Sequence, residues 1–336
     1  MLEDYKQYKV DSILDSPIDE RDVWYSDLCK STISKPINEY NIEYQFDARN
    51  QDKTGTCAFQ SVTATVEIIK NVKEYLSEGF LNAMRSSYDC YLATGAITRE
   101  IVALACKCGF ITKKEFPNLE DYPTIEKSFN KLKNKDELIK KAKNLKCVGY
   151  CRLTVDDVVD YLINENKPIV LTTKLRDSFY ETNYPGTNGI VKYPPKGDNV
   201  YNHAMVIVGF KYINGELYFK ILNSWGRFWC LKGYCYLNAK SPEINELWGF
   251  TDKRVIEEPK EKEYLYRLQL GAFGKYENCV SYCKELNGKG IATCIKNVNG
   301  LYKIQVGCFK SKNNAINYQK EIRSIGYNCF IVTEEL

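Results

Sequence analysis

The C-terminal part of the chain contains an internal duplication with an offset of 36 residues. The segments LYRLQLGAF, which starts at Leu265, and LYKIQVGCF, which starts at Leu301, open the two halves. A repeat at a fixed offset means that one supersecondary unit occurs twice, so both halves must adopt one fold. Several further positions are identical between the halves: Tyr266/Tyr302, Gln269/Gln305, Gly271/Gly307, Phe273/Phe309, Asn278/Asn314, Tyr282/Tyr318, Glu285/Glu321 and Gly290/Gly326.

Each half has the pattern of a strand, a glycine, a helix and a second short strand. The first segments alternate in polarity, and the helical stretches end at Gly290 and Gly326. We therefore predict two βαβ units within residues 264–336, which form one four-stranded sheet with two helices. The period of two places apolar and polar side chains on opposite faces: Leu268, Leu270, Ile304 and Val306 on one, and Arg267, Gln269, Lys303 and Gln305 on the other.

The polar face of this predicted sheet has two interpretations. The helices must cover the apolar face, which leaves the polar face open. An open, polar and mildly basic surface suits a polar polymer such as a glycan. The same pattern fits equally well a sheet face that is merely solvated.

A charged segment separates the duplication from the rest of the chain. Residues 252–263, DKRVIEEPKEKE, contain nine charged residues and a proline without apolar periodicity, which is typical of a solvated linker. The length of 336 residues exceeds the usual size of one domain, so we expect two cores. The predicted division is an N-terminal leader or short pro-segment at 1–46, a large domain at 47–251, the linker at 252–263 and the repeat domain at 264–336.

In the large domain, the predicted helices come before the predicted strands. An apolar stripe that includes Phe59, Val62, Val66 and Ile69 predicts a helix that begins at Cys57, and further helices are expected near 124–146 and 155–164. A loop-rich stretch at 176–201 is followed by expected strands at 204–208, 217–222 and 233–237. This order indicates an α+β fold.

Fourteen cysteines accompany a single histidine, His203. One imidazole excludes the His-rich zinc and non-haem iron sites, and the cysteines lack the paired spacing of zinc ribbons, so we expect no metal and no cofactor. The start, MLEDYKQYKVDS, has charges where a secretory signal needs its apolar run, so we expect synthesis in the cytoplasm and mostly reduced thiols. The formal net charge of +4 forms no basic patch that indicates nucleic acid, and no apolar stretch approaches the ~20 residues of a membrane span.

Cys57 is the candidate nucleophile, because it stands at the start of the first predicted helix, where the helix dipole favours a thiolate. Gln51 precedes it by six residues, and Gly55 permits a close backbone approach. The Gln51 amide and the Cys57 backbone N–H would then form an oxyanion hole. The same window fits a buried structural cysteine equally well.

His203 lies in NHAMVIVGF, at the start of an apolar strand, and supplies the base that a cysteine nucleophile needs. In the segment ILNSWGRFWC, Asn223 is placed to accept a hydrogen bond from the imidazole, and Trp225 is placed to shield that bond from water. The alternative for Asn223 is a loop cap at the end of a strand.

In this order, QxxxxGxC, NHAMVIVGF and NSWGxxW resemble the papain-like cysteine peptidases. The resemblance covers about residues 47–250 and implies a two-subdomain fold, a helical part plus an antiparallel sheet part. It implies Cys57 as nucleophile, His203 as general base and acid, Asn223 as the orienting residue, and Gln51 with Cys57 as oxyanion donors. The segments DSPIDERDVWY, GAITREIV and GFITKKEFP also resemble a bacterial, archaeal and viral branch of that family.

Two positions depart from the family pattern. Ala58 replaces the tryptophan that usually follows the cysteine, and Cys230 replaces the glycine expected after Trp229. Neither change removes a reacting group, so they affect the expected shape of the cleft and leave the expected reaction intact.

The tandem pattern at 264–333 resembles the SPOR domain, a module that binds peptidoglycan glycan strands lacking their peptides. In that family the exposed sheet face carries the glycan. The resemblance therefore implies Gln269 and Gln305 as glycan-binding positions, with Arg267 and Lys303 beside them on the same face.

Together these features indicate a cysteine endopeptidase that a glycan-binding domain holds at the cell wall, septum or spore peptidoglycan of a bacterium or in a phage. The expected partners are a protein or peptide substrate and peptidoglycan glycan strands, reached after lysis or release. The alternatives are a peptidoglycan stem-peptide endopeptidase, or lysin, and a catalytically silent glycan-binding protein. The sequence leaves open the side-chain specificity, the oligomeric state and whether residues 1–46 are inhibitory or removed.

Overall fold

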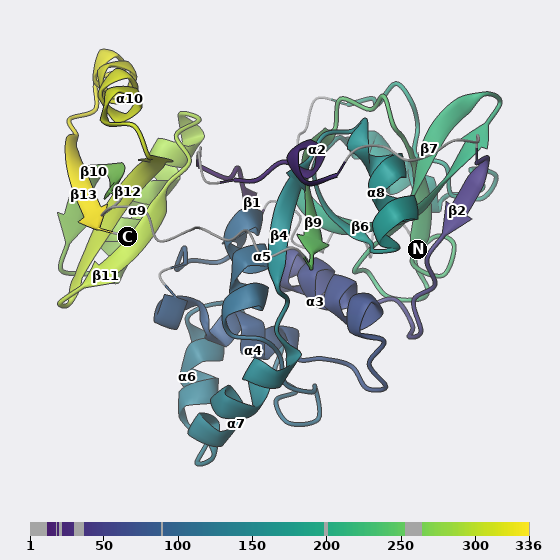
Figure 1. Ribbon diagram of the computed structural model, residues 1–336, viewed down its shortest axis with the longest axis horizontal. Coiled ribbons are helices and arrows are strands. Elements are labelled where there is room, and N and C mark those ends of the chain that lie inside the picture. The colour runs from purple at the N-terminus through teal and green to yellow at the C-terminus, as the bar shows by residue number, and fades with distance from the viewer. Residues whose placement is uncertain are drawn as a thin grey trace. The chain divides into compact units, whose positions relative to one another are not determined.

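A computed structural model describes residues 12–17, 19, 22–29, 37–88, 90–197, 201–252 and 264–335 (Figure 1). These residues form two compact units. The larger unit holds 12–13, 23–29, 37–84 and 94–252, and the smaller unit holds 14–17, 19, 22, 85–88, 90–93 and 264–335. Except for Asp252, the predicted charged linker lies outside the described residues.

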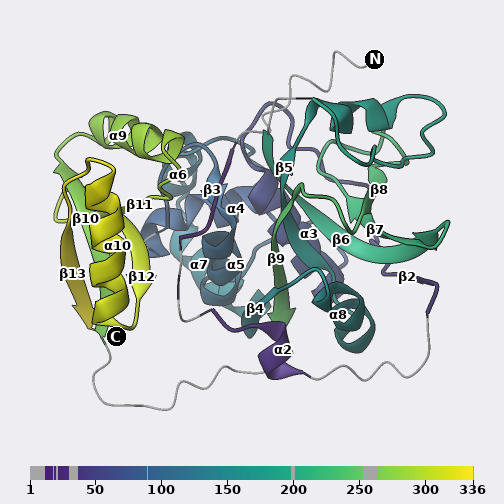
Figure 2. The same ribbon diagram turned by 90° about the horizontal axis from the view of Figure 1, so that it is seen from above.

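The helical part of the larger unit is organised around helix α3, Cys57–Lys70. Every residue of α3 from Cys57 to Glu67 is buried. The helix contacts α4 (Glu78–Ala83) and α5 (Thr98–Lys107) on one side and strands β5 (Ile169–Leu175) and β6 (Tyr201–Ile213) on the other (Figures 1 and 2). It ends where Asn71 takes a left-handed conformation, a common helix stop. The other helices of this unit are α2 (Tyr25–Leu28), α4 (Glu78–Ala83), α5 (Thr98–Lys107), α6 (Thr124–Asn130), α7 (Lys135–Ala142) and α8 (Asp157–Glu165), with 3-10 turns η2 (Lys143–Leu145) and η3 (Asp177–Asn183).

The large sheet is antiparallel throughout, with the strand order β4-β9-β5-β6-β7-β8, and β2 also pairs with β6. Strand β6 is buried from His203 to Phe210, because it has neighbours on both edges and α3 against it. At Gly209 the backbone of β2 comes so close that a Cβ would lie 2.2 Å from the Tyr40 carbonyl oxygen, so this position requires glycine. The strands are β2 (Glu39–Asn41), β4 (Gly149–Leu153), β5 (Ile169–Leu175), β6 (Tyr201–Ile213), β7 (Glu216–Leu222), β8 (Tyr234–Asn238) and β9 (Ile244–Thr251).

The elements expected in the large domain are present. The helix that begins at Cys57, the helices near 124–146 and 155–164, and the strands at 204–208, 217–222 and 233–237 all occur. Strands β4, β5 and β9 were not predicted, although they form one side of the sheet. Strand β2 pairs with β6, so the larger unit also includes residues upstream of position 47.

The duplication forms the predicted four-stranded sheet with two helices. The first half comprises β10 (Tyr264–Phe273), α9 (Tyr276–Gly288) and β11 (Cys294–Val298), and the second comprises β12 (Leu301–Phe309), α10 (Lys312–Ser324) and β13 (Phe330–Glu335). The order β11-β12-β10-β13 puts the two corresponding strands, β10 and β12, at the centre, and both helices contact them (Figure 2). The four predicted core residues Leu268, Leu270, Ile304 and Val306 are buried.

One expectation about this sheet is wrong. The polar face was expected to be open, but Gln269 and Gln305 are each only 7% exposed, and β12 is buried at every residue from Ile304 to Phe309. Residues within 14–22 and 85–93 belong to the same compact unit, and Asp19 forms a parallel bridge with Cys308. A pattern confined to residues 264–336 cannot reveal that segments from the N-terminal part of the chain pack in this unit.

Three further observations concern the described residues alone. No helix among them is long and apolar enough to cross a membrane. No group of three His, Cys, Asp or Glu side chains in that part of the chain could hold a metal ion. All fourteen cysteines are described, and none of them forms a disulfide.

Candidate functional site

Cys57 occupies the N-terminus of α3 and is fully buried. The cap residue Thr56 lies with its hydroxyl 2.7 Å from Thr54 Oγ1. Burial raises the pKa of the Cys57 thiol, whereas hydrogen bonds at Ser12 and at the backbone of Ala204 oppose this rise. The sulfur therefore lies beside the residue that follows His203 in strand β6.

His203 and Asn223 meet because β6 and β7 are neighbouring strands. His203 is near the start of β6, and Asn223 directly follows the end of β7. His203 Nε2 lies 2.8 Å from Asn223 Oδ1, and both side chains are buried. The structure thus joins two of the predicted site residues by a hydrogen bond.

The hydrogen bonds of Asn223 fix the tautomer of this imidazole. Asn223 Oδ1 also accepts a hydrogen bond from the backbone N–H of Ser224 at 2.8 Å, so this atom is the amide oxygen. His203 Nε2 must therefore carry the proton that it donates to Asn223. In the neutral ring Nδ1 is then an acceptor, and it has no hydrogen-bond partner among the described residues. The ring is held so that Nδ1 can receive a proton.

The buried surroundings favour the neutral forms of both groups. Burial lowers the pKa of His203 to about 4, and the hydrogen bond with Asn223 opposes this decrease. Since the pKa of Cys57 is raised, a neutral thiol and a neutral imidazole are the stable pair near pH 7 in this arrangement. No hydrogen bond joins the two side chains within the part of the chain that the structure describes.

Aromatic rings cover the imidazole. The Trp225 ring centroid lies 5.3 Å from that of His203, and Trp225 is only 2% exposed. Trp225 in turn packs against Phe179, Tyr180 and Trp229, with centroid distances of 5.4 to 5.7 Å. Trp225 therefore lies against the His203 ring within a buried aromatic cluster.

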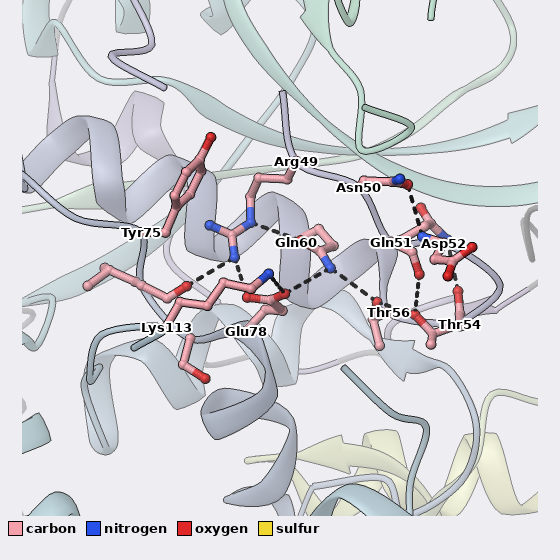
Figure 3. A network of polar contacts seen from close by, with 12 residues as sticks. Arg49, Asn50, Gln51, Asp52, Thr54, Thr56, Gln60, Tyr75, Glu78 and Lys113 are labelled. Atoms are coloured by element: carbon pink, nitrogen blue, oxygen red, sulfur yellow. Dashed lines mark hydrogen bonds and ion pairs between the residues drawn. The ribbon is translucent and has the colours of Figure 1, made fainter. Parts of the chain in front are cut away.

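Gln51 lies on a segment that pairs with the loop after Asn223. Its backbone N–H donates to the Ser224 carbonyl at 2.9 Å, and the Ser224 hydroxyl donates to Gln51 Oε1 at 2.7 Å. Gln51 Nε2 donates to the Thr54 carbonyl at 3.0 Å (Figure 3). Because Oε1 accepts the hydrogen bond from the Ser224 hydroxyl, Nε2 is fixed as the donor of this amide.

The N-terminal segment enters this site, a possibility that the sequence had left open. Ser12 Oγ lies 3.4 Å from Cys57 Sγ, and Ser12 and Ile13 are 6% and 2% exposed. Strand β1 (Ile13–Leu14) pairs with β3 (Ala96–Ile97), and the Ala96 N–H donates to the Ser12 carbonyl at 2.8 Å. The Ser12 side chain therefore lies against the thiol.

Gly95 is the sequence signal that could have indicated this close approach. Its φ is +92°, and a Cβ at this position would lie 2.1 Å from the Ser12 carbonyl oxygen. Ser12 itself stands in no pattern that distinguishes it, so its contact with Cys57 could not be predicted.

The four predicted glycan-binding residues belong to the smaller unit. Gln269 and Gln305 are directly opposite each other on β10 and β12. Arg267 and Lys303 are half-buried, and Arg267 Nε lies 3.5 Å from Glu334 Oε2. The structure therefore brings the glutamines together as the duplication implies, but with little of either side chain exposed.

Two family models match this chain. Residues 41–248 match the family model of the papain family cysteine proteases, and residues 262–333 match the model of the SPOR domain. A "Cysteine protease" of Blomia tropicalis is 23% identical over 205 residues, and the match covers 56% of this chain and 56% of that protein. The chain thus spans about half the length of this curated relative.

Two solved structures show the same fold as the larger unit. Xylellain, a cysteine protease from Xylella fastidiosa, superposes with a TM-score of 0.59 at 21% identity, covering 74% of this chain and 98% of that one. Procathepsin L2 proteinase from the larval midgut of Tenebrio molitor superposes with a TM-score of 0.53 at 16% identity, covering 74% and 80%.

The burial of His203 predicts a loss of stability in acid. Its folded pKa of about 4 lies below the ordinary value of 6.5, so between pH 6.5 and 4 the unfolded chain takes up a proton that the folded chain does not. At 1.36 kcal/mol per pH unit, this costs about 3 kcal/mol of unfolding free energy over that range and nothing above it. Between pH 6.5 and 4, the unfolding free energy measured with urea should therefore fall by about 3 kcal/mol more in the wild-type chain than in His203→Gln. Equal losses in the two chains would contradict this prediction.

Proposed function

Because the chain belongs to the papain family of cysteine proteases, we propose that it hydrolyses peptide bonds with Cys57, His203 and Asn223. The observation that carries this proposal is the 2.8 Å hydrogen bond between His203 Nε2 and Asn223 Oδ1, which leaves His203 Nδ1 as an acceptor. The next residue in β6, Ala204, contacts the Cys57 sulfur through its backbone. A nucleophile, a base and a residue that orients the base are the groups that this chemistry needs.

In the proposed reaction the Cys57 thiol transfers its proton to His203 Nδ1, and the thiolate attacks the carbonyl carbon of the scissile bond. The oxyanion accepts hydrogen bonds from Gln51 Nε2 and from the Cys57 backbone N–H at the start of α3. His203 then gives its proton to the departing amine as the C–N bond breaks, which leaves a thioester. Water attacks the thioester with His203 as base, the C–S bond breaks and the carboxylic acid product leaves. The proton on His203 then returns to the sulfur, which restores the thiol.

We further propose that the segment at Ser12 and Ile13 blocks the enzyme. Ser12 Oγ takes a position beside the sulfur, where a scissile carbonyl would have to lie. The neutral thiol and imidazole also fit a resting state, because the segment keeps water and substrate from both groups. Displacing the segment admits water, which lowers the cost of the charged pair.

For the C-terminal domain, we propose binding to peptidoglycan glycan strands through the face of Gln269, Gln305, Arg267 and Lys303. Arg267 and Lys303 are half-buried, and the two glutamines, each 7% exposed, must become accessible for this binding. The match to the SPOR domain supports this role. Glycan binding would hold the enzyme at a cell wall or septum, where its substrates are proteins or, as the alternative, the stem peptides of peptidoglycan itself.

The triad is tested with a peptide substrate and with purified sacculi. Cys57→Ala should abolish turnover, and Gln51→Ala should lower kcat about 100- to 1000-fold, the usual effect of losing one oxyanion donor. New amines released from peptide and protein substrates alone would indicate a protein endopeptidase, and new amines from sacculi would indicate the stem-peptide alternative. Full turnover by Cys57→Ala would disprove the mechanism.

The blocking role of the N-terminal segment is tested by Ile13→Asp in the full chain. A carboxylate at a position that is 2% exposed should expel the segment, since burying an unpaired charge costs several kcal/mol. We expect alkylation of Cys57 by iodoacetamide to accelerate about tenfold or more. Asp15→Asn, which changes a solvent-exposed residue two positions away, is the control and should leave the rate unchanged. An unchanged rate in Ile13→Asp would show that the segment does not block the thiol.

Wall binding is tested by co-sedimentation of the full-length Cys57→Ala chain with sacculi stripped of their peptides. The double variant Lys303→Ala and Gln305→Ala should weaken binding about 30-fold, because it removes two hydrogen-bonding groups worth about 1 kcal/mol each. Lys320→Gln on the exposed side of α10 is the matched control. Equal sedimentation of all these chains would exclude this face of the sheet as the binding surface.

A further inference from the structure

A buried polar network lies behind the oxyanion segment, and we call its four members Arg49, Gln60, Glu67 and Glu78 the Arg49 network. Arg49 Nε donates to Gln60 Oε1 at 2.8 Å, and Arg49 Nη1 donates to Glu67 Oε1 at 2.6 Å. Arg49 Nη2 donates to the Leu76 carbonyl at 3.0 Å and to Glu78 Oε2 (Figure 3). One guanidinium thereby forms two hydrogen bonds with side chains of α3, one with a side chain of α4 and one with the backbone of the segment between these helices.

The network is almost free of solvent contact. The side chains of Arg49, Glu67 and Glu78 are 3%, 0% and 1% exposed. Lys113, at its half-exposed edge, lies 2.6 Å from Glu78 Oε1, so two cations balance two carboxylates. If one of these charges lost its partner, the other would be buried without compensation, which is costly. This cost holds the members of the network at fixed positions.

The backbone of Arg49 reaches the opposite side of the site. The Gly226 N–H donates to the Arg49 carbonyl at 2.8 Å, and Asn50 forms an antiparallel bridge with Trp225. Arg49 therefore bonds through its side chain to the helix that begins with Cys57, and through its backbone to the loop that follows Asn223.

A chain of hydrogen bonds continues from the network to Gln51. Gln60 Nε2 donates to Thr56 Oγ1 at 3.4 Å, and Thr56 Oγ1 lies 2.7 Å from Thr54 Oγ1. The Thr54 hydroxyl donates to the Gln51 carbonyl at 2.6 Å, and the Gln51 amide returns to the Thr54 carbonyl (Figure 3). The residue that caps α3 and the residue that holds Gln51 are thus in direct contact.

We propose that Arg49 is a positioning residue for the oxyanion hole: its bonds to Gln60 and Glu67 on α3, and its backbone pairing beside Gln51, set the distance between the Gln51 amide and the Cys57 backbone N–H. This inference rests on the proposed peptidase function. Two donors that must converge on one oxygen tolerate little displacement, since a shift of about 1 Å can cost about 100-fold in rate.

The geometry requires arginine in particular. The guanidinium presents its N–H groups in a rigid fork, and here they reach four acceptors: Gln60, Glu67, Glu78 and the Leu76 carbonyl. A lysine would keep the charge but could not reach all four from one position. Arg49→Lys is therefore the variant that separates geometry from charge.

The experiment measures the effect of Arg49→Lys in two full-length backgrounds, one with Gln51 and one with Gln51→Ala. Both are made in the wild-type chain if it turns over substrate, and otherwise in the Ile13→Asp chain. With Gln51 present, we expect kcat to fall about 10- to 100-fold while KM stays within about threefold. In the Gln51→Ala background the same change should cost less than about twofold, because the donor that Arg49 positions is already gone. Equal losses in both backgrounds would overturn the proposal.

A second readout separates positioning from general damage to the site. Alkylation of Cys57 by iodoacetamide needs the thiolate but no oxyanion hole, so Arg49→Lys should leave its rate within about twofold. A loss of alkylation in parallel with kcat would overturn the proposal. Lys114→Met, which breaks the exposed pair with Glu74, is the matched control and should change neither rate.

If Arg49→Lys does not melt cooperatively, Thr54→Val replaces it, because valine keeps the shape and removes the hydroxyl between Thr56 and Gln51. Its kcat should fall only when Gln51 is present, and an unchanged kcat would overturn the proposal. Failure of the peptidase function is distinguishable, since turnover would then survive Cys57→Ala and Gln51→Ala. If turnover depends on Cys57 and Gln51 but the effect of Arg49→Lys does not depend on Gln51, the positioning role is refuted and the peptidase function stands.

Discussion

The pairing of the buried Arg49 guanidinium with two carboxylates is the interaction on which the arrangement of the site depends. A charge taken out of water costs several kcal/mol unless a partner compensates it, so Arg49, Glu67 and Glu78 must enter the interior together. They come from three separate segments: the stretch before α3, α3 itself and α4. Folding therefore cannot bury one of these segments without placing the other two, and the Cys57 helix is fixed relative to Gln51 as a result.

Exclusion of water explains the electrostatics of the proposed triad. The thiol and the imidazole are both fully buried, which raises the pKa of Cys57 and lowers that of His203. A thiolate–imidazolium pair needs a lowered pKa of Cys57 and a raised pKa of His203. The same residues can therefore be inert in one state of the chain and reactive in another. The Ser12 side chain lies against the thiol, and the Trp225 ring lies against the imidazole.

Sequence patterns predicted the elements whose periodicity is local. The apolar stripe after Cys57, the strand that holds His203 and the duplicated sheet all follow from residues close in sequence. Contacts between distant segments could not be predicted. Ser12 meets Cys57 across 45 positions, and Glu67 has the chemistry of a solvated helix residue but lies buried against Arg49. For the same reason, the low exposure of Gln269 and Gln305 was missed, because alternation of polarity within a strand cannot report what packs on either face.

The duplication gives the C-terminal sheet an approximate twofold axis. Strands β10 and β12 run antiparallel at its centre, and Gln269 is directly opposite its own counterpart, Gln305. Arg267 and Lys303 repeat the same charge across that axis. A directional polymer laid over this face would meet nearly the same groups whichever way it ran. The direction of any bound strand must therefore be selected by positions where the halves differ, such as Ala272 and Cys308, which are exposed and buried, respectively.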